Sequence, residues 1–474
     1  MSAISHLGYR MRLILALGMA LLLALSTTTL AFGSSSQITL EQLSQDPYTN
    51  GPPSEHKTQV EPDTFSYGST IVSAFQSGRF FGGGASNVGW ATSTDDGATW
   101  HNGFLPGTTP YSTPPGPYGR LSDSAVSFDA RHNTWLIASL AMNSGARGIA
   151  IIVNQSTDGG LTWNNPVVVA STQTSYLDKD WIVCDDTSTS KFYGNCYVEW
   201  DDFGNLSLMQ MSTSSDSGTT WGAATHTARN ARGLGGQPLV QPNGTVIVPY
   251  ASRSGNIESY LSNNGGKSWN APVDIATIDA HPVAGKMRSE PLPSAEIDGE
   301  GIVYVAWHDC RFENNCSAND IVYSSSSDGK TWSTVQRIPI DPVNSGVDHF
   351  IPGIAVDTST SGSSAHIAMT YYYFPNASCS NDCQLDVGYI SSINGGASWS
   401  PGQQLAGPMN PTWLANTNQG YMVGDYISTS ILSNGSAYPA FAVASAPTST
   451  GLNEATYTVI GGLPVTGGTI VSSD

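Results

Sequence analysis

The sequence predicts an all-β protein, a β-propeller made of four-stranded antiparallel blades. Three observations lead to this prediction. A short turn motif recurs along the chain, strand-like segments surround each copy, and the spacing of the copies is that of one blade. Seven blades are favoured, and six are the alternative.

The repeated motif reads Ser-x-Asp-x-Gly-x-Thr-Trp. Three copies are complete, two carry Asn for Asp and Ser for Thr, and one has Ser327 in the Asp position. Asp, Asn and Ser side chains bond back to the amides of tight turns, and Gly supplies a backbone angle that other residues resist. The Trp that ends each copy is expected to be buried between neighbouring sheets. These Trp residues are Trp100, Trp163, Trp221, Trp269, Trp332 and Trp399.

The segments between the motif copies have the composition of short strands. A β-rich stretch such as 148–153 precedes a copy, and a pair such as 293–297 and 302–307 comes earlier in the repeat. The motif Trp residues are on average about 60 positions apart, which suits a blade with long loops. After Trp399 there is room for one more repeat, with strands expected at 426–432, 437–444 and 456–461. An N-terminal strand that completes this last repeat gives seven blades.

The charge of the chain excludes two classes of partner. Lys+Arg 18 against Asp+Glu 37 gives a formal charge of −19. A nucleic-acid partner requires a basic patch, and an anionic membrane surface attracts basic segments. We therefore expect neither nucleic acid nor membrane as a partner of the mature chain.

The N-terminus has the pattern of a signal peptide. Arg10 and Arg12 precede an uncharged apolar stretch at 13–25, which is short for a membrane span, and small residues follow it. The predicted divisions are a signal peptide at 1–33, an N-terminal linker at 34–58, the propeller at 59–466 and a C-terminal tail at 467–474. The protein is expected to be secreted and extracellular, and an uncleaved membrane anchor is the alternative.

Six cysteines occur in three pairs that are close in sequence. An even number of cysteines in an exported chain indicates disulfides, and local pairing is the simplest of the fifteen connectivities. A zinc site is the rival interpretation, but the spacings do not resemble a zinc ribbon or finger. The expected pairs are Cys184 with Cys196, Cys310 with Cys316, and Cys379 with Cys383.

The repeated motif resembles the Asp box of the BNR (bacterial neuraminidase repeat) proteins in the sialidase-like β-propeller superfamily. The resemblance covers about residues 59–466. It implies the propeller fold, with the boxes on outer hairpins away from the active face. Similar boxes occur in sialidases, other glycoside hydrolases, sorting receptors and non-catalytic secreted proteins, so fold alone does not fix the function.

The first function that the resemblance implies is a secreted exo-α-sialidase acting on terminal acidic sugars of extracellular glycans. Such chemistry needs Arg side chains that bind the substrate carboxylate, a Tyr nucleophile activated by a Glu, and an Asp acid/base. The starts of the innermost strands are expected to face a central funnel. These segments are 60–62, 120–123, 178–180, 237–238, 288–290, 348–349 and 425–426.

The candidate site residues come from these segments and from nearby loops. The resemblance implies Tyr426 as the nucleophile, Glu290 as its activator and Asp123 as the acid. Arg288, Arg311, Arg79 and Arg120 are the candidate ligand contacts.

Each candidate also has a structural interpretation. Tyr426 also suits a half-buried strand position, Glu290 suits a local ion pair with Arg288, and Asp123 suits a turn cap. His349 fits a structural role as well as a proton shuttle. No cofactor is expected. Structural calcium at Asp185-Asp186 or Asp201-Asp202 stays open, because loop acids of an acidic protein are usually only solvated.

A second function comes from a departure from the sialidase pattern. Sialidases usually carry an Arg-Ile-Pro motif in the first blade, and here Glu61-Pro62 occupies that neighbourhood. The alternative is therefore a non-catalytic propeller that binds glycans or proteins, and a structural adhesion protein is a third interpretation. The expected partner is a glycan or carbohydrate ligand, and the chain is expected to be a monomer.

Overall fold

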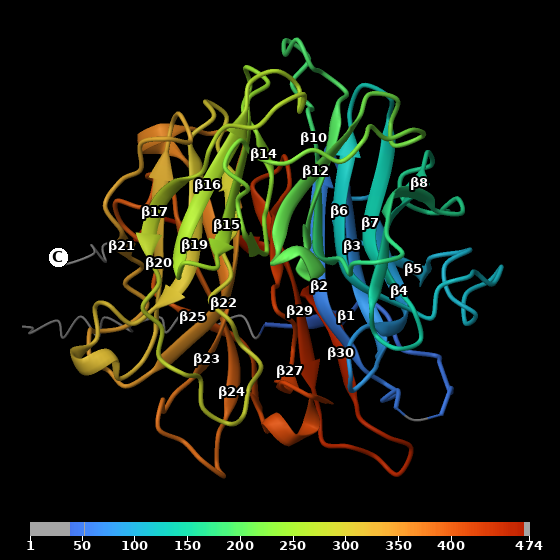
Figure 1. Ribbon diagram of the computed structural model, residues 1–474. Coiled ribbons are helices and arrows are strands. Elements are labelled where there is room, and N and C mark those ends of the chain that lie inside the picture. The colour runs from blue at the N-terminus through green and yellow to red at the C-terminus, as the bar shows by residue number, and fades with distance from the viewer. Residues whose placement is uncertain (1–37, 52, 469–474) are drawn as a thin grey trace, which may run out of the picture. The chain divides into compact units, whose positions relative to one another are not determined.

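A computed structural model describes residues 38–51 and 53–468 of this protein (Figure 1). The predicted signal peptide at 1–33 and the end of the predicted tail, 469–474, lie outside the described residues. The described part is all-β, and its strands pair in antiparallel sheets, as the sequence predicted. No described helix is long and apolar enough to cross a membrane. The helical turns are η1 (Phe203–Asn205), η2 (Asn314–Cys316), η3 (Gly362–Ser364) and η4 (Pro411–Trp413).

The first three repeats form two sheets. The larger sheet combines the first and second repeats, which join through one residue pairing, Ala85 with Leu121. Its strands are β2 (Gln59–Tyr67), β3 (Thr70–Arg79), β4 (Ala85–Ser93), β5 (His101–Phe104), β6 (Arg120–Asp129), β7 (Thr134–Met142), β8 (Gly148–Ser156) and β9 (Val167–Ser171). The next sheet contains β10 (Asp178–Cys184), β11 (Cys196–Asp202) and β12 (Leu208–Ser214).

Three further sheets follow in chain order. The first contains β13 (Gly233–Leu234), β14 (Leu239–Val240), β15 (Val246–Ser252), β16 (Asn256–Ser262) and β17 (Val273–Thr277). The second contains β18 (Ser294–Ile297), β19 (Val303–Asp309), β20 (Asp320–Ser326) and β21 (Gln336–Arg337). The third contains β22 (Asp348–Val356), β23 (Ile367–Phe374), β24 (Leu385–Ser392) and β25 (Gln403–Met409).

The last sheet joins the two ends of the described chain. Strand β1 (Leu40–Gln42) pairs with β30, so part of the predicted linker at 34–58 lies in a sheet. The sheet order is β1-β30-β29-β28, with β31 beside β29. Its C-terminal strands are β28 (Ser428–Ile431), β29 (Ser436–Ala444), β30 (Glu454–Val459) and β31 (Leu463–Pro464), and β26 (Ala415–Thr417) and β27 (Gly420–Met422) form a separate hairpin.

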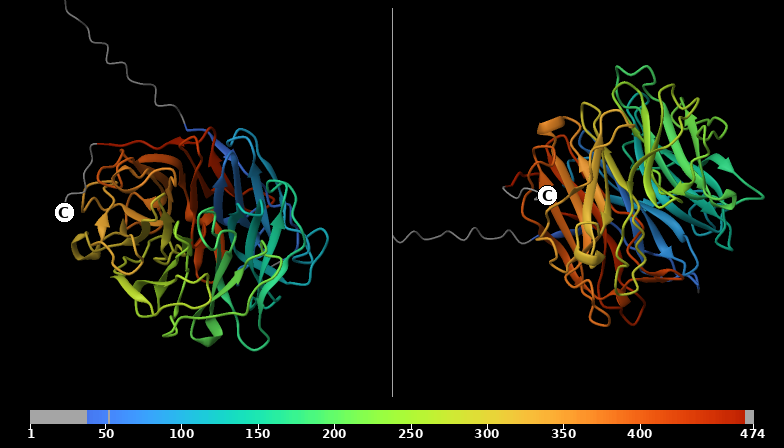
Figure 2. Two further views of the ribbon diagram at one scale, coloured as in Figure 1. Left: turned by 90° about the horizontal axis from the view of Figure 1, so that it is seen from above. Right: turned by 60° about the vertical axis from the view of Figure 1, so that its left-hand side comes forward.

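The first strand of each repeat lies toward a common centre. Seven such strands contact one another in chain order, and the last of them, β28, returns to contact the first, β2. Figure 2 shows the sheets following one another around this centre from the N-terminal to the C-terminal colours. The ring of strands is β2, β6, β10, β14, β18, β22 and β28. The centre is therefore built by residues that are far apart in the sequence.

The repeated motif forms the turn after the third strand of a repeat. In the second repeat, the hydroxyl of Ser156 accepts a hydrogen bond from the Gly160 amide at 2.9 Å, and Asp158 accepts one from the Thr162 amide at 2.9 Å. Gly160 has φ of 80°, a conformation that glycine adopts without strain. The side chains therefore fasten the turn in the way that the motif predicted.

The Trp residues of the motif pack to different depths. Trp163, Trp269 and Trp399 are buried, whereas Trp100, Trp221 and Trp332 are half-buried. Trp163 lies 6.4 Å from Trp90 between ring centroids, in a hydrophobic cluster that draws residues from the first two repeats. This Trp therefore joins two neighbouring repeats.

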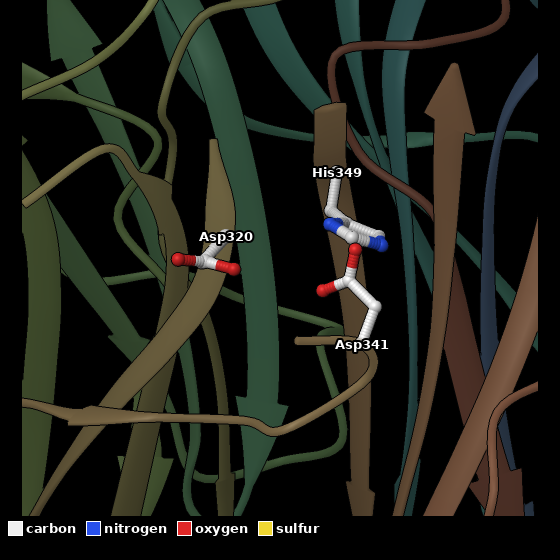
Figure 3. A group of neighbouring side chains, drawn as sticks. All are labelled: Asp320, Asp341 and His349. Carbon is white, nitrogen blue, oxygen red and sulfur yellow. The ribbon is translucent and has the colours of Figure 1, made fainter. Parts of the chain in front are cut away.

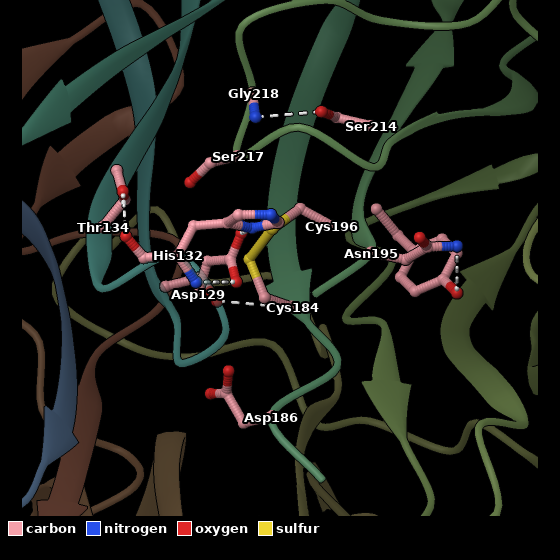
Figure 4. Close-up of a disulfide and its surroundings, with 12 residues drawn as sticks. Asp129, His132, Thr134, Cys184, Asp186, Asn195, Cys196, Ser214, Ser217 and Gly218 are labelled. Carbon is pink, nitrogen blue, oxygen red and sulfur yellow. Dashed lines mark hydrogen bonds and ion pairs between the residues drawn. A yellow bond between two sulfur atoms is a disulfide. The ribbon is translucent and has the colours of Figure 1, made fainter. Parts of the chain in front are cut away.

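The three predicted disulfides are present. They link Cys184 to Cys196, Cys310 to Cys316 and Cys379 to Cys383, and no free cysteine remains. Figure 4 shows the first of them, which joins the end of β10 to the start of β11. The loops that they close are short, so each removes little entropy from the unfolded chain.

Mass spectrometry can test the pairing. We expect the non-reduced mature protein to weigh six hydrogens less than the fully reduced chain, because each disulfide removes two. Alkylation without a reductant should modify no cysteine. A cysteine that reacts with the alkylating agent in the native protein contradicts the assignment.

Candidate functional site

The central strands carry bulges at equivalent places. The strand register shifts in β2, β6 and β10, and the residue at each shift has a positive φ: Glu61 at 53°, Asp123 at 47° and Lys179 at 39°. Strand β22 has the same irregularity at Ile351. Bulges re-aim side chains and are frequent next to functional sites. Here three of the four bulges carry a charged residue.

The charged residues meet around one ammonium group. The Lys179 Nζ lies 2.9 Å from an oxygen of Asp123, 2.5 Å from one of Asp425 and 3.4 Å from one of Glu61. We call Glu61, Asp123, Lys179, Arg288 and Asp425 the central cluster. Lys179 and its three acidic partners are almost completely buried. Four segments that are distant in the sequence therefore bring one ammonium group and three carboxyl groups together at the centre.

Arg288 completes the central cluster through a two-pronged contact. Its Nε donates to Oδ1 of Asp425 at 2.6 Å, and its Nη2 donates to Oδ2 of the same carboxylate. The Asp425 amide in turn donates to Glu61 Oε1 at 3.0 Å. The planar fork of Arg288 is therefore already matched to a carboxylate, which is the geometry that an acidic ligand would require.

The surroundings shift the pKa values of Glu61 and Asp425 in opposite directions. Burial raises the pKa of Glu61 to about 7, although Lys179 opposes the shift. Burial also acts on Asp425, but Arg288 and Lys179 outweigh it and hold its pKa well below the usual range. Near neutral pH the cluster thus contains one carboxyl that exchanges a proton and one that stays ionised, a combination that active sites use.

The structure places Tyr426 directly beside the central cluster. Its hydroxyl donates to the Ser124 carbonyl at 3.1 Å, and its ring makes an edge contact with Trp181 at 5.1 Å between centroids. Burial and then the nearby Glu61 raise the pKa of Tyr426 well above its usual value. Among the described residues no carboxylate bonds to this hydroxyl, so no activating base touches the predicted nucleophile.

Of the two candidate arginines in the first two repeats, Arg79 lies near the central cluster, whereas Arg120 contacts only residues outside it in the described part of the chain. Arg79, the last residue of β3, is buried, donates to the Gly84 carbonyl at 2.7 Å, and has its pKa lowered to about 10 by burial and by Arg288. The Arg120 guanidinium lies 4.2 Å from the Phe80 ring centroid and donates to two backbone carbonyls. Both guanidinium groups already have protein partners.

The remaining candidates are not brought to the central cluster. The side chain of Glu290 is exposed and has no hydrogen bond or ion pair in the described part of the chain, so the local pair expected with Arg288 is absent. Arg311 binds Asp309 through Nε at 2.8 Å and Nη2 at 2.7 Å, and lies over Trp307. The structure therefore unites Asp123, Arg288, Arg79 and Tyr426, and separates Glu290 and Arg311 from them.

Three residues of the central cluster were part of the expected funnel segments but had no role assigned from the sequence. They are Glu61, Lys179 and Asp425, which lie in inner segments that the repeat pattern identified. A lysine between two aspartates, Asp178 and Asp180, is an unusual sequence for a buried strand, because unpaired charges are rarely buried. That pattern is the signal by which sequence reasoning can find Lys179.

Further acids extend from the cluster into the third repeat. The carboxyl oxygens of Asp180 and Glu199 are buried and have no hydrogen-bond partner among the described residues. Burial, then Asp123 near Asp180 and Asp201 near Glu199, raise both pKa values well above the usual range. These two carboxyl groups are therefore harder to ionise in the folded protein than in water.

A separate group of possible metal ligands lies on the later repeats. Asp320, Asp341 and His349 bring one ligand atom each within 4.8 Å of one another (Figure 3). Arg337 Nη2 lies 2.7 Å from an oxygen of each aspartate. A cation is therefore already present between the two carboxylates, and burial lowers the pKa of His349 to about 4, so the histidine is neutral. We assign no metal to this group, and the neutral ring makes His349 a poor proton shuttle near pH 7.

The sequence and fold were compared with known proteins. Residues 135–353 match the BNR repeat-like domain. A search of curated proteins found no match. Among solved structures, a polysaccharide lyase that is an ulvan lyase bound to a GlcA–Rha3S saccharide has a TM-score of 0.51 and 10% identity, over 90% of this chain and 97% of that chain. At this identity the likeness shows the fold alone.

Two further solved structures resemble the chain with lower TM-scores. A protein of unknown function from Dyadobacter fermentans has a TM-score of 0.48 and 16% identity, over 75% of this chain and 99% of that chain. The NanB sialidase from Streptococcus pneumoniae has a TM-score of 0.43 and 14% identity, over 89% of this chain and 70% of that chain.

Proposed function

We propose, from the match of residues 135–353 to the BNR repeat-like domain, that the chain is a secreted, monomeric β-propeller that binds glycans at its central cluster. The ligand is held at the end of the propeller where the inner strands begin. Sugar hydroxyls can both donate and accept hydrogen bonds, and the cluster offers carboxylate acceptors beside the donors of Lys179 and Arg288. The proposal needs no cofactor.

The proposed propeller has seven blades. The supporting observation is the closed ring of seven contacting inner strands, from β2 to β28 and back to β2. In this arrangement β1 supplies the outer strand of the last blade, because it pairs with β30. This pairing covers the edge of β30, which would otherwise be exposed.

The balance of charge favours a neutral glycan over an acidic one. Arg79, Lys179 and Arg288 are the cationic groups at the centre, and Glu61, Asp123, Asp178 and Asp425 face them. A sialic acid carboxylate would have to displace Asp425 from Arg288 and would leave that buried carboxylate with fewer partners. The Arg288 guanidinium is already bonded through two nitrogens to Asp425. This is the single observation on which the preference for binding over sialidase chemistry depends.

Exo-α-sialidase activity is the second candidate function. Asp123 lies near Tyr426, and Arg79 and Arg288 lie near Asp123, so these residues supply a part of the set that sialidase chemistry needs. Turnover would require Tyr426 to release the Ser124 carbonyl and to gain a base, for which Glu61 is the carboxyl whose charge acts most strongly on Tyr426.

One pair of assays separates the two functions. We expect the purified mature protein to bind neutral glycans on an array and to release no product from a fluorogenic sialoside between pH 4 and 8. Circular dichroism should show that the same sample is folded. Sialoside turnover that Tyr426→Phe abolishes establishes the sialidase instead, and a folded protein that binds no glycan contradicts glycan recognition.

A further inference from the structure

Exposed aromatic rings gather at the end of the molecule where the inner strands begin. Five aromatic side chains of the described part are exposed. Four of them lie in loops at this end: Phe81 between β3 and β4, Tyr111 before β6, Tyr176 before β10 and Phe203 after β11. The fifth, Tyr67, is the last residue of β2 and lies at the opposite end of that strand. Exposed apolar surface that is concentrated in one place marks a binding surface.

Tyr176 and Phe203 contact each other and form one aromatic surface. Their ring centroids are 4.8 Å apart at an interplanar angle of 34°, and the side chains are 39% and 44% exposed. Their positions continue the antiparallel register of Asp178 with Asp201 by two residues, which places the two rings on the same face. We call Tyr176 and Phe203 the aromatic pair.

The backbone around the aromatic pair is fixed by contacts between its two loops and a third. The Gly204 amide donates to the Tyr176 carbonyl at 3.1 Å, and the Arg147 Nε donates to the Ser175 carbonyl at 2.7 Å. The Ser175 hydroxyl donates to the Asp202 carboxylate. A Cβ at Gly204 would overlap the Ser175 hydroxyl, so the close approach of the loops requires glycine. The rings are therefore held in place before a ligand arrives, which lowers the entropic cost of binding.

The aromatic pair lies beside the central cluster rather than within it. Tyr176 is three residues before Lys179, so their Cα atoms are at most about 10 Å apart. Asp178 lies between them in the sequence, and the charges of Asp123 and Lys179 act on it. A ligand of a few linked sugar units can therefore reach from the central cluster onto the rings.

We propose that the aromatic pair is a second sugar subsite, onto which a neutral oligosaccharide held at the central cluster extends. This inference rests on the proposed glycan-binding function and adds the length of the ligand and the path that it takes. One face of a sugar ring presents C–H groups, and the face of an aromatic ring carries the negative part of its quadrupole, so the two faces attract each other. The sugar hydroxyls at the edge stay in water.

The surroundings of the aromatic pair suit a sugar better than a protein partner. A stable protein interface buries about 800 Å² on each partner around an apolar core. The other exposed residues of 172–177 and 203–207 are mostly polar or glycine, and one is a leucine: Gln173, Thr174, Gly204, Asn205 and Leu206. Two rings and one leucine form a narrow apolar track with polar edges, which matches a chain of sugars.

Titration calorimetry with the tightest neutral oligosaccharide found on the glycan array tests the inference. We expect Phe203→Ala to weaken its binding about three- to tenfold and Phe203→Tyr to bind like the wild type, because the aromatic face is kept. Tyr67→Ala is the matched control. Its ring also contacts a second ring, that of Phe128, at 4.4 Å and 34°, but lies at the far end of β2, so its loss should leave the affinity unchanged.

Proton NMR supplies a readout that is specific to stacking. An aromatic ring shields protons above its face, so C–H signals of the bound oligosaccharide should move upfield with the wild type and with Tyr67→Ala. The shift should be smaller with Phe203→Ala. If circular dichroism shows that Phe203→Ala does not fold, Tyr176→Leu takes its place in both measurements.

The outcomes distinguish failure of the subsite from failure of the proposed function. Equal oligosaccharide affinity in Phe203→Ala and the wild type, or single sugars that bind the array protein as tightly as oligosaccharides, overturns the subsite. The central cluster still stands in that case if Arg288→Ala weakens binding. A loss in Phe203→Ala without one in Arg288→Ala leaves the glycan on the rings and contradicts binding at the central cluster. A folded wild type that binds no glycan, but captures a protein through Phe203, overturns both.

Discussion

Replacing Trp163 with alanine should destabilise the protein by about 3–5 kcal/mol, the usual range for removal of a buried Trp. The ring is buried in the cluster that joins the first two repeats, and its Nε1 donates to the Gly160 carbonyl at 3.1 Å. The substitution leaves a cavity between two sheets and removes one of the two hydrogen bonds that the Gly160 carbonyl accepts, the other coming from the Thr92 hydroxyl at 2.8 Å. Chemical denaturation followed by fluorescence or circular dichroism measures the loss.

The same substitution should leave ligand affinity per folded molecule unchanged. Trp163 lies at the turn after β8, whereas the central cluster comes from the inner strands. Tyr176→Ala is a matched control, because it removes an aromatic ring that is 39% exposed and should cost little stability. A Trp163→Ala variant that melts normally but loses ligand binding would reverse our assignment of scaffold and site.

Lys179→Met should also be strongly destabilising, by about 3–5 kcal/mol near pH 8. The ammonium group is buried and lies within ion-pair distance of Glu61, Asp123 and Asp425. Without it, Asp123 loses its only ion pair in the described part of the structure, and Asp425 retains only Arg288. Thermal and chemical unfolding of the variant measure this cost.

The loss of folding stability in Lys179→Met, relative to the wild type, should become smaller as the pH falls. Loss of Lys179 raises the pKa of the carboxyl groups around it, so the folded variant takes up protons that the unfolded chain does not, and its stability rises toward acid pH. Glu61 is the first of these groups to take up a proton as the pH falls, because its pKa is about 7 even with Lys179 present. Lys267→Met, at an exposed position, is the control and should change little at any pH. A deficit independent of pH would show that Lys179 acts through packing alone.

The sequence was sufficient to predict the repeated part of the fold. The motif specifies its own turn through Ser, Asp and Gly, so each copy is a local structure that needs no tertiary information. Cysteines such as Cys310 and Cys316 are also close enough in sequence to pair locally. Strand β1 was harder to place, because its three residues have no pattern of their own and gain order by pairing with β30.

The central site was predictable only in part. The repeat pattern indicated which segments begin the inner strands, and so identified Asp123, Arg288 and the neighbourhood of Tyr426. It did not reveal which carboxylate each cation would meet, because the contact of Lys179 with Asp425 joins residues 246 positions apart. Nor did it show that Glu290 points to solvent, since that depends on the loop between Arg288 and β18.

If a ligand is held at the central cluster, titration of the best array glycan into two arginine variants should distinguish this site from an ion pair elsewhere on the protein. Arg288 and Arg311 each bind an aspartate through two nitrogens, but only Arg288 belongs to the cluster. We expect Arg288→Ala to weaken binding at least about tenfold in its folded fraction, equivalent to about 1.4 kcal/mol, and Arg311→Ala to bind like the wild type. Unchanged affinity in Arg288→Ala, or a loss confined to Arg311→Ala, would show that the ligand binds outside the central cluster.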